Sequence, residues 1–411
     1  MITRGRYIRY MLKLKDRFGD RLSLKPWAVQ FFFVMLIPTM LALTQGCYRQ
    51  PNIKSEVPEM VWPKSSEKPR IRFLQTVSEP DDYQIRKGMF YRIMDYVAGF
   101  EAEALLVSPY GVEADQEGRL YVVDAFLKTV VVYDVKSNSY YHFDTGEKPL
   151  SSPIDIAVDF QRGNVYVTDS KTGAVFAYQD FGRKFIGFIG QGMLERPTGI
   201  AVNKVSSELL VVDTLVGDVL RFDLISHHFK GKFGPRDSSD SLHSPTHISV
   251  VQDGSVLVTD SLNFQVLKYD KNGNVIGRFG GAGDGPGYFS RPRGVAADSD
   301  GNVYVVDALF DNVQIFSHEG NLLMAFGEHG VDLGEFWLPA GIYIDGEDRI
   351  YVSDAYNKRI QIFQYLKEPI SKRLKSVTPA KADVQKRTEN TGFQLSPELQ
   401  QLTFEIGSKE Q

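Results

Sequence analysis

The stretch Arg291-Pro-Arg-Gly-Val-Ala-Ala-Asp-Ser-Asp-Gly-Asn-Val-Tyr-Val-Val-Asp307 decides the fold of this chain. Its two apolar runs, residues 294–298 and 302–307, are joined by Ser-Asp-Gly, a pattern typical of a tight turn between two strands. The pattern recurs six times, with the second run ending at Asp124, Asp169, Asp213, Asp260, Asp307 and Asp354. A proline precedes each aspartate by 15 or 16 residues, at Pro109, Pro153, Pro197, Pro245, Pro292 and Pro339.

Each repeat contains two further apolar runs, which in the fifth repeat are residues 313–316 and 321–326. Four short strands at a period of 44 to 47 residues are typical of a β-propeller. Because one four-stranded unit cannot bury both of its faces, neighbouring units must stack around an axis. The sequence therefore predicts an all-β, six-bladed propeller. The sixfold recurrence of the aspartates predicts an architectural role, in which they cap turn N–H groups.

The ends of the repeat region predict how the ring closes. The sixth repeat has only three strands and ends near Tyr365, whereas Ile71–Val77 alternates with the period of a strand and belongs to no repeat of its own. We expect this N-terminal strand to complete the last blade, which would remove an exposed sheet edge.

Two segments carry a resemblance to a known family. They are Gly287-Tyr-Phe-Ser-Arg-Pro-Arg-Gly-Val-Ala-Ala-Asp298 with Tyr304-Val-Val-Asp307, and Gly334-Glu-Phe-Trp-Leu-Pro-Ala-Gly-Ile-Tyr-Ile-Asp345 with Tyr351-Val-Ser-Asp354. In these motifs the chain resembles the NHL-repeat family of six-bladed propellers, over roughly residues 105 to 365. The resemblance implies an NHL-type propeller.

The first 46 residues resemble a bacterial lipoprotein signal. The first 26 residues carry eight Lys or Arg against two Asp, and a nearly continuous apolar run, residues 28–43, precedes Thr44-Gln-Gly-Cys47. The resemblance implies lipidation of Cys47, whereas an uncleaved anchor and an ordinary cleaved signal are the alternatives. The expected organisation is a signal peptide with a long basic n-region (1–46), a tether (47–70), the propeller (71–366) and a disordered basic and polar tail (367–411).

Composition limits the possible partners. Between residues 105 and 365 there are 22 Lys or Arg and 34 Asp or Glu, and this acidic body argues against nucleic acid as a partner. The single cysteine excludes an intramolecular disulfide and a cysteine-based zinc site. We expect a protein exported to the cell envelope and held at the membrane by its lipid, with an envelope protein or a hydrophobic ligand as partner and no cofactor.

Positions that depart from the repeat are candidates for function. Two residues after each proline stand Gly111, Asp155, Gly199, His247, Gly294 and Gly341. Asp155 and His247 thus place a carboxylate and an imidazole near the expected channel mouth. Some propeller enzymes, amidating lyases and lactonases among them, build metal sites there, so a metal-dependent lyase or hydrolase is the alternative function. Catalytic zinc usually has three protein ligands, and only one histidine stands at this depth, so no metal ligand is assigned.

The loops after the second strands depart more broadly. The family usually has a polar loop here, whereas five repeats of this chain carry apolar residues that we expect to surround the channel mouth: Phe126, Leu127, Leu215, Val216, Leu262, Phe264, Leu309, Phe310 and Tyr356. A contiguous apolar surface usually marks a contact with a partner or a membrane, although these side chains could instead pack onto neighbouring blades. We therefore expect a binding scaffold, with no catalytic residue assigned.

Overall fold

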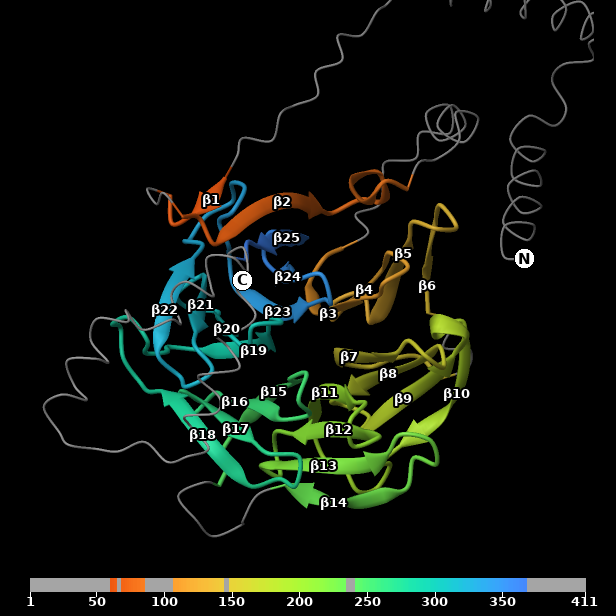
Figure 1. The fold of residues 1–411 in the computed structure, drawn as a ribbon. Helices are drawn as coiled ribbons and strands as arrows, with labels where there is room; N and C mark the ends of the chain where they lie inside the picture. Colours follow the sequence, from red (N-terminus) through yellow and green to blue (C-terminus); the bar gives the residue numbers. More distant parts are fainter. Residues whose placement is uncertain (1–59, 65–67, 86–105, 144–147, 234–240, 368–411) are drawn as a thin grey trace, which may run out of the picture. The chain divides into compact units, whose positions relative to one another are not determined.

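Each sequence repeat folds into one antiparallel sheet, and six such sheets, the blades, surround a common axis (Figure 1). The computed structural model describes residues 60–64, 68–85, 106–143, 148–233 and 241–367. The first strands of neighbouring blades contact one another all the way around the ring, so these strands line the axis. The predicted all-β, six-bladed propeller is confirmed.

In the first five blades the strands follow one another in chain order from the axis outward. Blade 1 is β3 (Pro109–Ala114), β4 (Arg119–Asp124), β5 (Thr129–Asp134) and β6 (Ser139–His142), and blade 2 is β7 (Pro153–Asp159), β8 (Asn164–Asp169), β9 (Ala174–Gln179) and β10 (Lys184–Ile189). Blade 3 is β11 (Pro197–Asn203), β12 (Glu208–Asp213), β13 (Asp218–Asp223) and β14 (Phe229–Phe233), and blade 4 is β15 (Pro245–Val250), β16 (Val256–Asp260), β17 (Gln265–Tyr269) and β18 (Val275–Gly280). Blade 5 is β19 (Pro292–Ala297), β20 (Val303–Asp307), β21 (Asn312–Phe316) and β22 (Leu322–Phe326).

Blade 6 joins the two ends of the described chain. Its inner strands are β23 (Pro339–Ile344), β24 (Arg349–Asp354) and β25 (Arg359–Tyr365), and β2 (Ile71–Val77) pairs antiparallel with β25. Figure 1 shows the orange β2 beside the blue β25. The predicted closing strand is therefore confirmed, with the expected residues.

A short strand, β1 (Val61–Trp62), adds to the outer edge of β2. It falls within the segment expected to be a tether, and the sequence does not predict it. Its Trp62 ring lies 5.9 Å from the ring of Phe326 in blade 5 and 5.7 Å from that of Phe363 in blade 6. The strand forms because its tryptophan fills the gap between two blades.

The hydrophobic core lies between blades, with each cluster shared by two neighbours. Many strands consist of nearly continuous apolar residues, because each face of a blade packs against a neighbouring blade. Helix is limited to two 3₁₀ turns, η1 (Pro80–Tyr83) and η2 (Asp180–Gly182), among the residues described. Within those residues no helix has the length and apolarity needed to span a membrane.

The aspartates that end the second strands cap turns, as predicted. In blade 1, Asp124 Oδ2 accepts the N–H groups of Val107 and Ser108 before the first strand, and Oδ1 accepts those of Phe126 and Leu127 after the second. Asp307 makes the equivalent bonds in blade 5. Each buried aspartate thus ties together the two loops at one end of its blade.

The signal sequence, Cys47 and the C-terminal tail fall in residues 1–59 and 368–411, which lie outside the described residues.

Candidate functional site: a closed apolar face and an open cavity

The two faces of the ring differ in which loops they carry. Because Pro292 pairs with Asp307, the start of each first strand lies beside the end of the second. One face, the loop face, therefore holds the loops after the second strands (125–128, 170–173, 214–217, 261–264, 308–311 and 355–358) and the loops that precede the first strands. The opposite turn face holds the turns between first and second strands (115–118, 160–163, 204–207, 251–255, 298–302 and 345–348).

The first strands approach one another most closely two residues after the prolines. A Cβ atom on Gly111 would lie 2.7 Å from the Cα atom of Asp155, and one on Gly199 would lie 2.7 Å from the Cα atom of His247. Contacts this short leave no room for a side chain. Glycine at these positions is therefore required by the narrowness of the ring.

Aromatic side chains meet across the axis just beneath the loop face. The rings of Tyr110 in blade 1 and His247 in blade 4 stack with centroids 5.8 Å apart and planes 17° apart, and the guanidinium of Arg293 lies 5.4 Å from the Tyr110 ring. Blades 1 and 4 are not neighbours, so this stack crosses the centre of the ring. It closes the channel on the side of the loop face, and we call these three side chains the plug.

His247 is buried in the plug, with only 4% of its surface exposed. Neither ring nitrogen has a hydrogen-bond partner among the described residues. Burial, together with the positive charge of Arg293, lowers the pKa of His247 to about 3. The imidazole is therefore neutral at physiological pH.

Asp155 joins two neighbouring blades. Its Oδ1 atom accepts the N–H of Ile156 at 3.0 Å and its Oδ2 atom accepts the N–H of Ile200 at 3.2 Å. Burial raises the pKa of this carboxyl to about 7. No hydrogen bond or ion pair joins Asp155 to His247 in the part of the chain that the structure describes, and no three His, Cys, Asp or Glu side chains in it converge to hold a metal.

The predicted apolar residues lie on the loop face. Phe126 is 70% exposed and Leu215 is 63% exposed, whereas Phe264 and Phe310 are half-buried. The remaining predicted residues are exposed as well: Leu127, Val216, Leu262, Leu309 and Tyr356. Three further exposed apolar residues, which the repeat register does not single out, join them from the loops before the first strands: Met193, Tyr288 and Val331.

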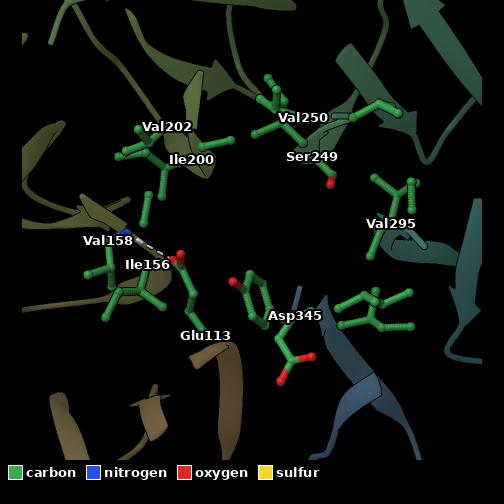
Figure 2. A pocket seen from close by; sticks show the side chains of 18 of the residues that line it. Glu113, Ile156, Val158, Ile200, Val202, Ser249, Val250, Val295 and Asp345 are labelled. Carbon is green, nitrogen blue, oxygen red and sulfur yellow. Dashed lines mark hydrogen bonds between the residues drawn. The ribbon is translucent and has the colours of Figure 1, made fainter. Parts of the chain in front are cut away.

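A cavity of about 360 Å³ opens on the turn face, on the other side of the plug. Its walls carry a ring of six β-branched side chains, one from each blade and each three residues after the proline: Val112, Ile156, Ile200, Ile248, Val295 and Ile342. Figure 2 shows Ile156, Ile200 and Val295 from three different blades around this space. The open cavity and the exposed apolar loops thus lie on opposite faces of the molecule.

Several polar side chains also line the cavity, and two of them depart from the repeat pattern of the first strands. The fourth residue after the proline is small in four blades (Ala157, Ala201, Ser249 and Ala296) but is Glu113 in blade 1 and Tyr343 in blade 6. Glu113 Oε2 accepts the N–H of Val158 at 2.9 Å, the bond drawn in Figure 2. Neither residue was among the predicted site residues, although the register that singled out Asp155 and His247 would also have shown them.

The two polar residues influence each other electrostatically. Burial first, and then the negative charge of Asp155, raises the pKa of Glu113 well above its usual range. Burial, and then the charge of Glu113, raises the pKa of Tyr343. Blades 1 and 6 are neighbours, so the carboxyl and the phenol share one side of the cavity.

Comparison with known proteins identifies the repeats. The model of the NHL repeat matches residues 150–178, 289–316 and 336–363, which lie in blades 2, 5 and 6. The protein is a six-bladed propeller that contains NHL repeats. No curated protein matches the sequence of this NHL propeller.

Solved structures share the fold of the NHL propeller. A structural-genomics protein of unknown function from Bacteroides thetaiotaomicron has 19% identity over 64% of this chain and 70% of its own, with a TM-score of 0.52. An auxiliary nutrient binding protein from the same organism has 18% identity over the same shares and a TM-score of 0.52. Virginiamycin B lyase from Staphylococcus aureus has 12% identity over 63% of this chain and 96% of its own, with a TM-score of 0.48. At 18–19% identity the similarity to the two Bacteroides proteins extends to the fold alone.

Proposed function

We propose that this NHL propeller is a binding module of the bacterial cell envelope, which recognises a partner protein through the apolar residues of its loop face. The observation that carries the proposal is the exposure of Phe126, Leu215 and Leu262 from three different blades on one face. Apolar side chains exposed together in this way usually mark an interface. The capping aspartates fix the loops that carry them, so the apolar residues are presented without a large ordering cost on binding.

The test replaces the most exposed of these residues while leaving the core unchanged. The triple variant Phe126→Ser, Leu215→Ser and Leu262→Ser should lose most of the partner recovered by cross-linking and pull-down from envelope membranes. A matched control carries Ile225→Ser, Ile276→Ser and Leu323→Ser, which are similarly exposed but lie away from the loop face. If both triple variants fold and recover the partner as the wild type does, the loop face is not the interface. Recovery of lipid without protein would assign the face to a membrane or hydrophobic ligand instead.

A metal-dependent lyase or hydrolase near Asp155 and His247 is the second candidate. The observation in its favour is that both buried nitrogens of His247 lack a hydrogen-bond partner among the described residues. Metal analysis of the purified protein separates the two functions. Stoichiometric zinc that is lost on His247→Ala would establish the second candidate, and a metal-free protein would count against it.

A further inference from the structure

The cavity on the turn face is separate from the proposed interface. The plug of Tyr110, His247 and Arg293 lies between the cavity and the loop face. The cavity is therefore accessible while a partner covers the loop face. Its volume of about 360 Å³ is in the range of small-molecule sites in proteins.

The walls of the cavity select an aliphatic body. Beyond the ring of six β-branched residues, the wall continues with Val158, Val202, Val250 and Ile344, each five residues after its proline. Valine and isoleucine have few rotamers, so these walls are stiff and their shape is largely set before a ligand binds. An aliphatic group buried against them gains about 0.8 kcal/mol for each CH₂.

Glu113 offers an acceptor to the contents of the cavity. The N–H of Val158 occupies Oε2, whereas Oε1 has no hydrogen-bond partner in the described part of the chain. Figure 2 shows the Glu113 carboxyl directed towards Val158, with Asp345 on the other side of the Glu113 side chain. The Tyr343 hydroxyl, also on the cavity wall, makes no hydrogen bond to any described residue either. A carboxyl oxygen and a phenol oxygen on neighbouring blades are thus both without a hydrogen-bond partner among the described residues.

The charged groups around Glu113 favour a cationic ligand. No described residue forms an ion pair with Glu113. Lys204 is exposed at the cavity mouth, with its ammonium 5.3 Å from the centre of the Phe160 ring, and its charge partly offsets the rise in the pKa of Glu113. Asp155 adds a second buried carboxyl, and Asp345 at the mouth is already bound by Arg349 and Tyr351. A buried carboxylate is costly unless it is paired, and burial accordingly raises the pKa of Glu113 well above its usual range.

We propose that this cavity binds a small organic amine, whose ammonium group donates to Glu113 and Tyr343 and whose aliphatic body packs against the valine and isoleucine walls. The ligand supplies the positive charge that the protein leaves out. A neutral alcohol of the same length would make the apolar contacts without the ion pair, and a carboxylate of the same length would bring no positive charge to pair with Glu113.

The experiment compares three matched probes on the full-length protein by isothermal titration calorimetry: n-hexylamine, n-hexanol and n-hexanoate. We expect saturable binding of one hexylamine, at least tenfold weaker binding of hexanol, and no binding of hexanoate. A hydrogen bond to a charged group contributes about 1.5–3 kcal/mol, so Glu113→Gln should weaken hexylamine binding by about 10- to 100-fold. Tyr343→Phe should have a smaller effect in the same direction.

Glu319→Gln is the control, because it removes the same charge from an exposed turn of blade 5 and should leave binding unchanged. Equal affinity for hexylamine and hexanol, or an absence of saturable amine binding up to millimolar concentration, would overturn the proposal without any variant. Hexylamine binding that survives Glu113→Gln in a folded protein would overturn it as well. The triple serine variant of the loop face should bind hexylamine normally, which separates this site from the proposed interface.

Discussion

At the scale of single residues, the repeat explains most side chains, and the residues that break it carry the chemistry. Asp124 and its five equivalents are buried because each has several N–H donors to satisfy its oxygens. His247 differs from them, because its ring is equally buried but neither nitrogen is satisfied by a described residue. Its ring stacks on the ring of Tyr110.

Replacing His247 by leucine should therefore stabilise the propeller at neutral pH. Leucine has a similar volume and removes two unsatisfied polar atoms, a gain of about 1–3 kcal/mol. Loss of the stacking on Tyr110 offsets about 0.5–1.5 kcal/mol of this gain. The free energy of unfolding measured by urea denaturation should therefore rise by about 1 kcal/mol. A loss of stability at pH 7 would contradict this account of the plug.

The same variant should also change how stability depends on pH. The pKa of His247 is about 3 in the folded protein and near 6.5 when unfolded, so below about pH 6 only the unfolded chain takes up a proton. Wild-type stability should fall by up to about 1.4 kcal/mol for each pH unit from this group between about pH 6 and pH 3. His247→Leu removes that contribution, so the stability of the variant should depend less steeply on pH over this range.

At the scale of elements, the closing strand β2 decides whether the ring is continuous. Phe73 on β2 is buried, and its ring meets that of Phe363 on β25 edge-on at 5.5 Å. The chain separation between these two strands is nearly the whole propeller. Their pairing removes an open edge from blade 6 that would otherwise be free to pair with other chains.

Phe73→Ala should accordingly destabilise the protein by about 3–5 kcal/mol, the usual cost of deleting a buried phenylalanine side chain. Thermal unfolding monitored by circular dichroism would measure the effect, and we expect aggregation to begin at a lower temperature than in the wild type. Phe229→Ala, on the outer strand β14 where the side chain is 41% exposed, is the matched control. Equal effects of the two variants would show that β2 does not hold the ring closed.

At the scale of the whole molecule, the two faces suit two different tasks. The loop face is closed at its centre by the plug and apolar at its periphery, whereas the turn face opens into a cavity with an acidic side. Under the two proposals, the loop face contacts a partner while the cavity of the turn face binds a small molecule.

The anchor proposed at Cys47 makes a prediction at this scale. Cys47 is the single cysteine of the chain, so fatty-acid labelling through a thiol must depend on it. Cys47→Ser should abolish labelling and shift the protein from the membrane to the soluble fraction, because acyl chains supply about 0.8 kcal/mol for each buried CH₂. Labelling that persists in the variant, or membrane association that does not change, would argue for an uncleaved anchor in place of a lipid.

The sequence by itself determined the number of blades, the strands within them, the capping aspartates and the closing role of Ile71–Val77. These features are local or periodic, so the spacing of apolar residues and turns specifies them. The sequence also predicted the apolar loops, because aligning the six repeats shows where a residue differs from its equivalents. Phe264 and Phe310 show the limit of that reasoning, because how far a side chain folds back depends on the neighbouring blade.

Only the tertiary structure decided which face of the channel is open. The stack of Tyr110 on His247 joins residues 137 positions apart on opposite sides of the ring. The charge of Glu113 raises the pKa of Tyr343 only because the first and last blades are neighbours. Such contacts depend on how closely six inner strands approach a common axis. The distance between the inner strands is set by the packing of all six blades together, so the sequence of a single repeat does not specify it.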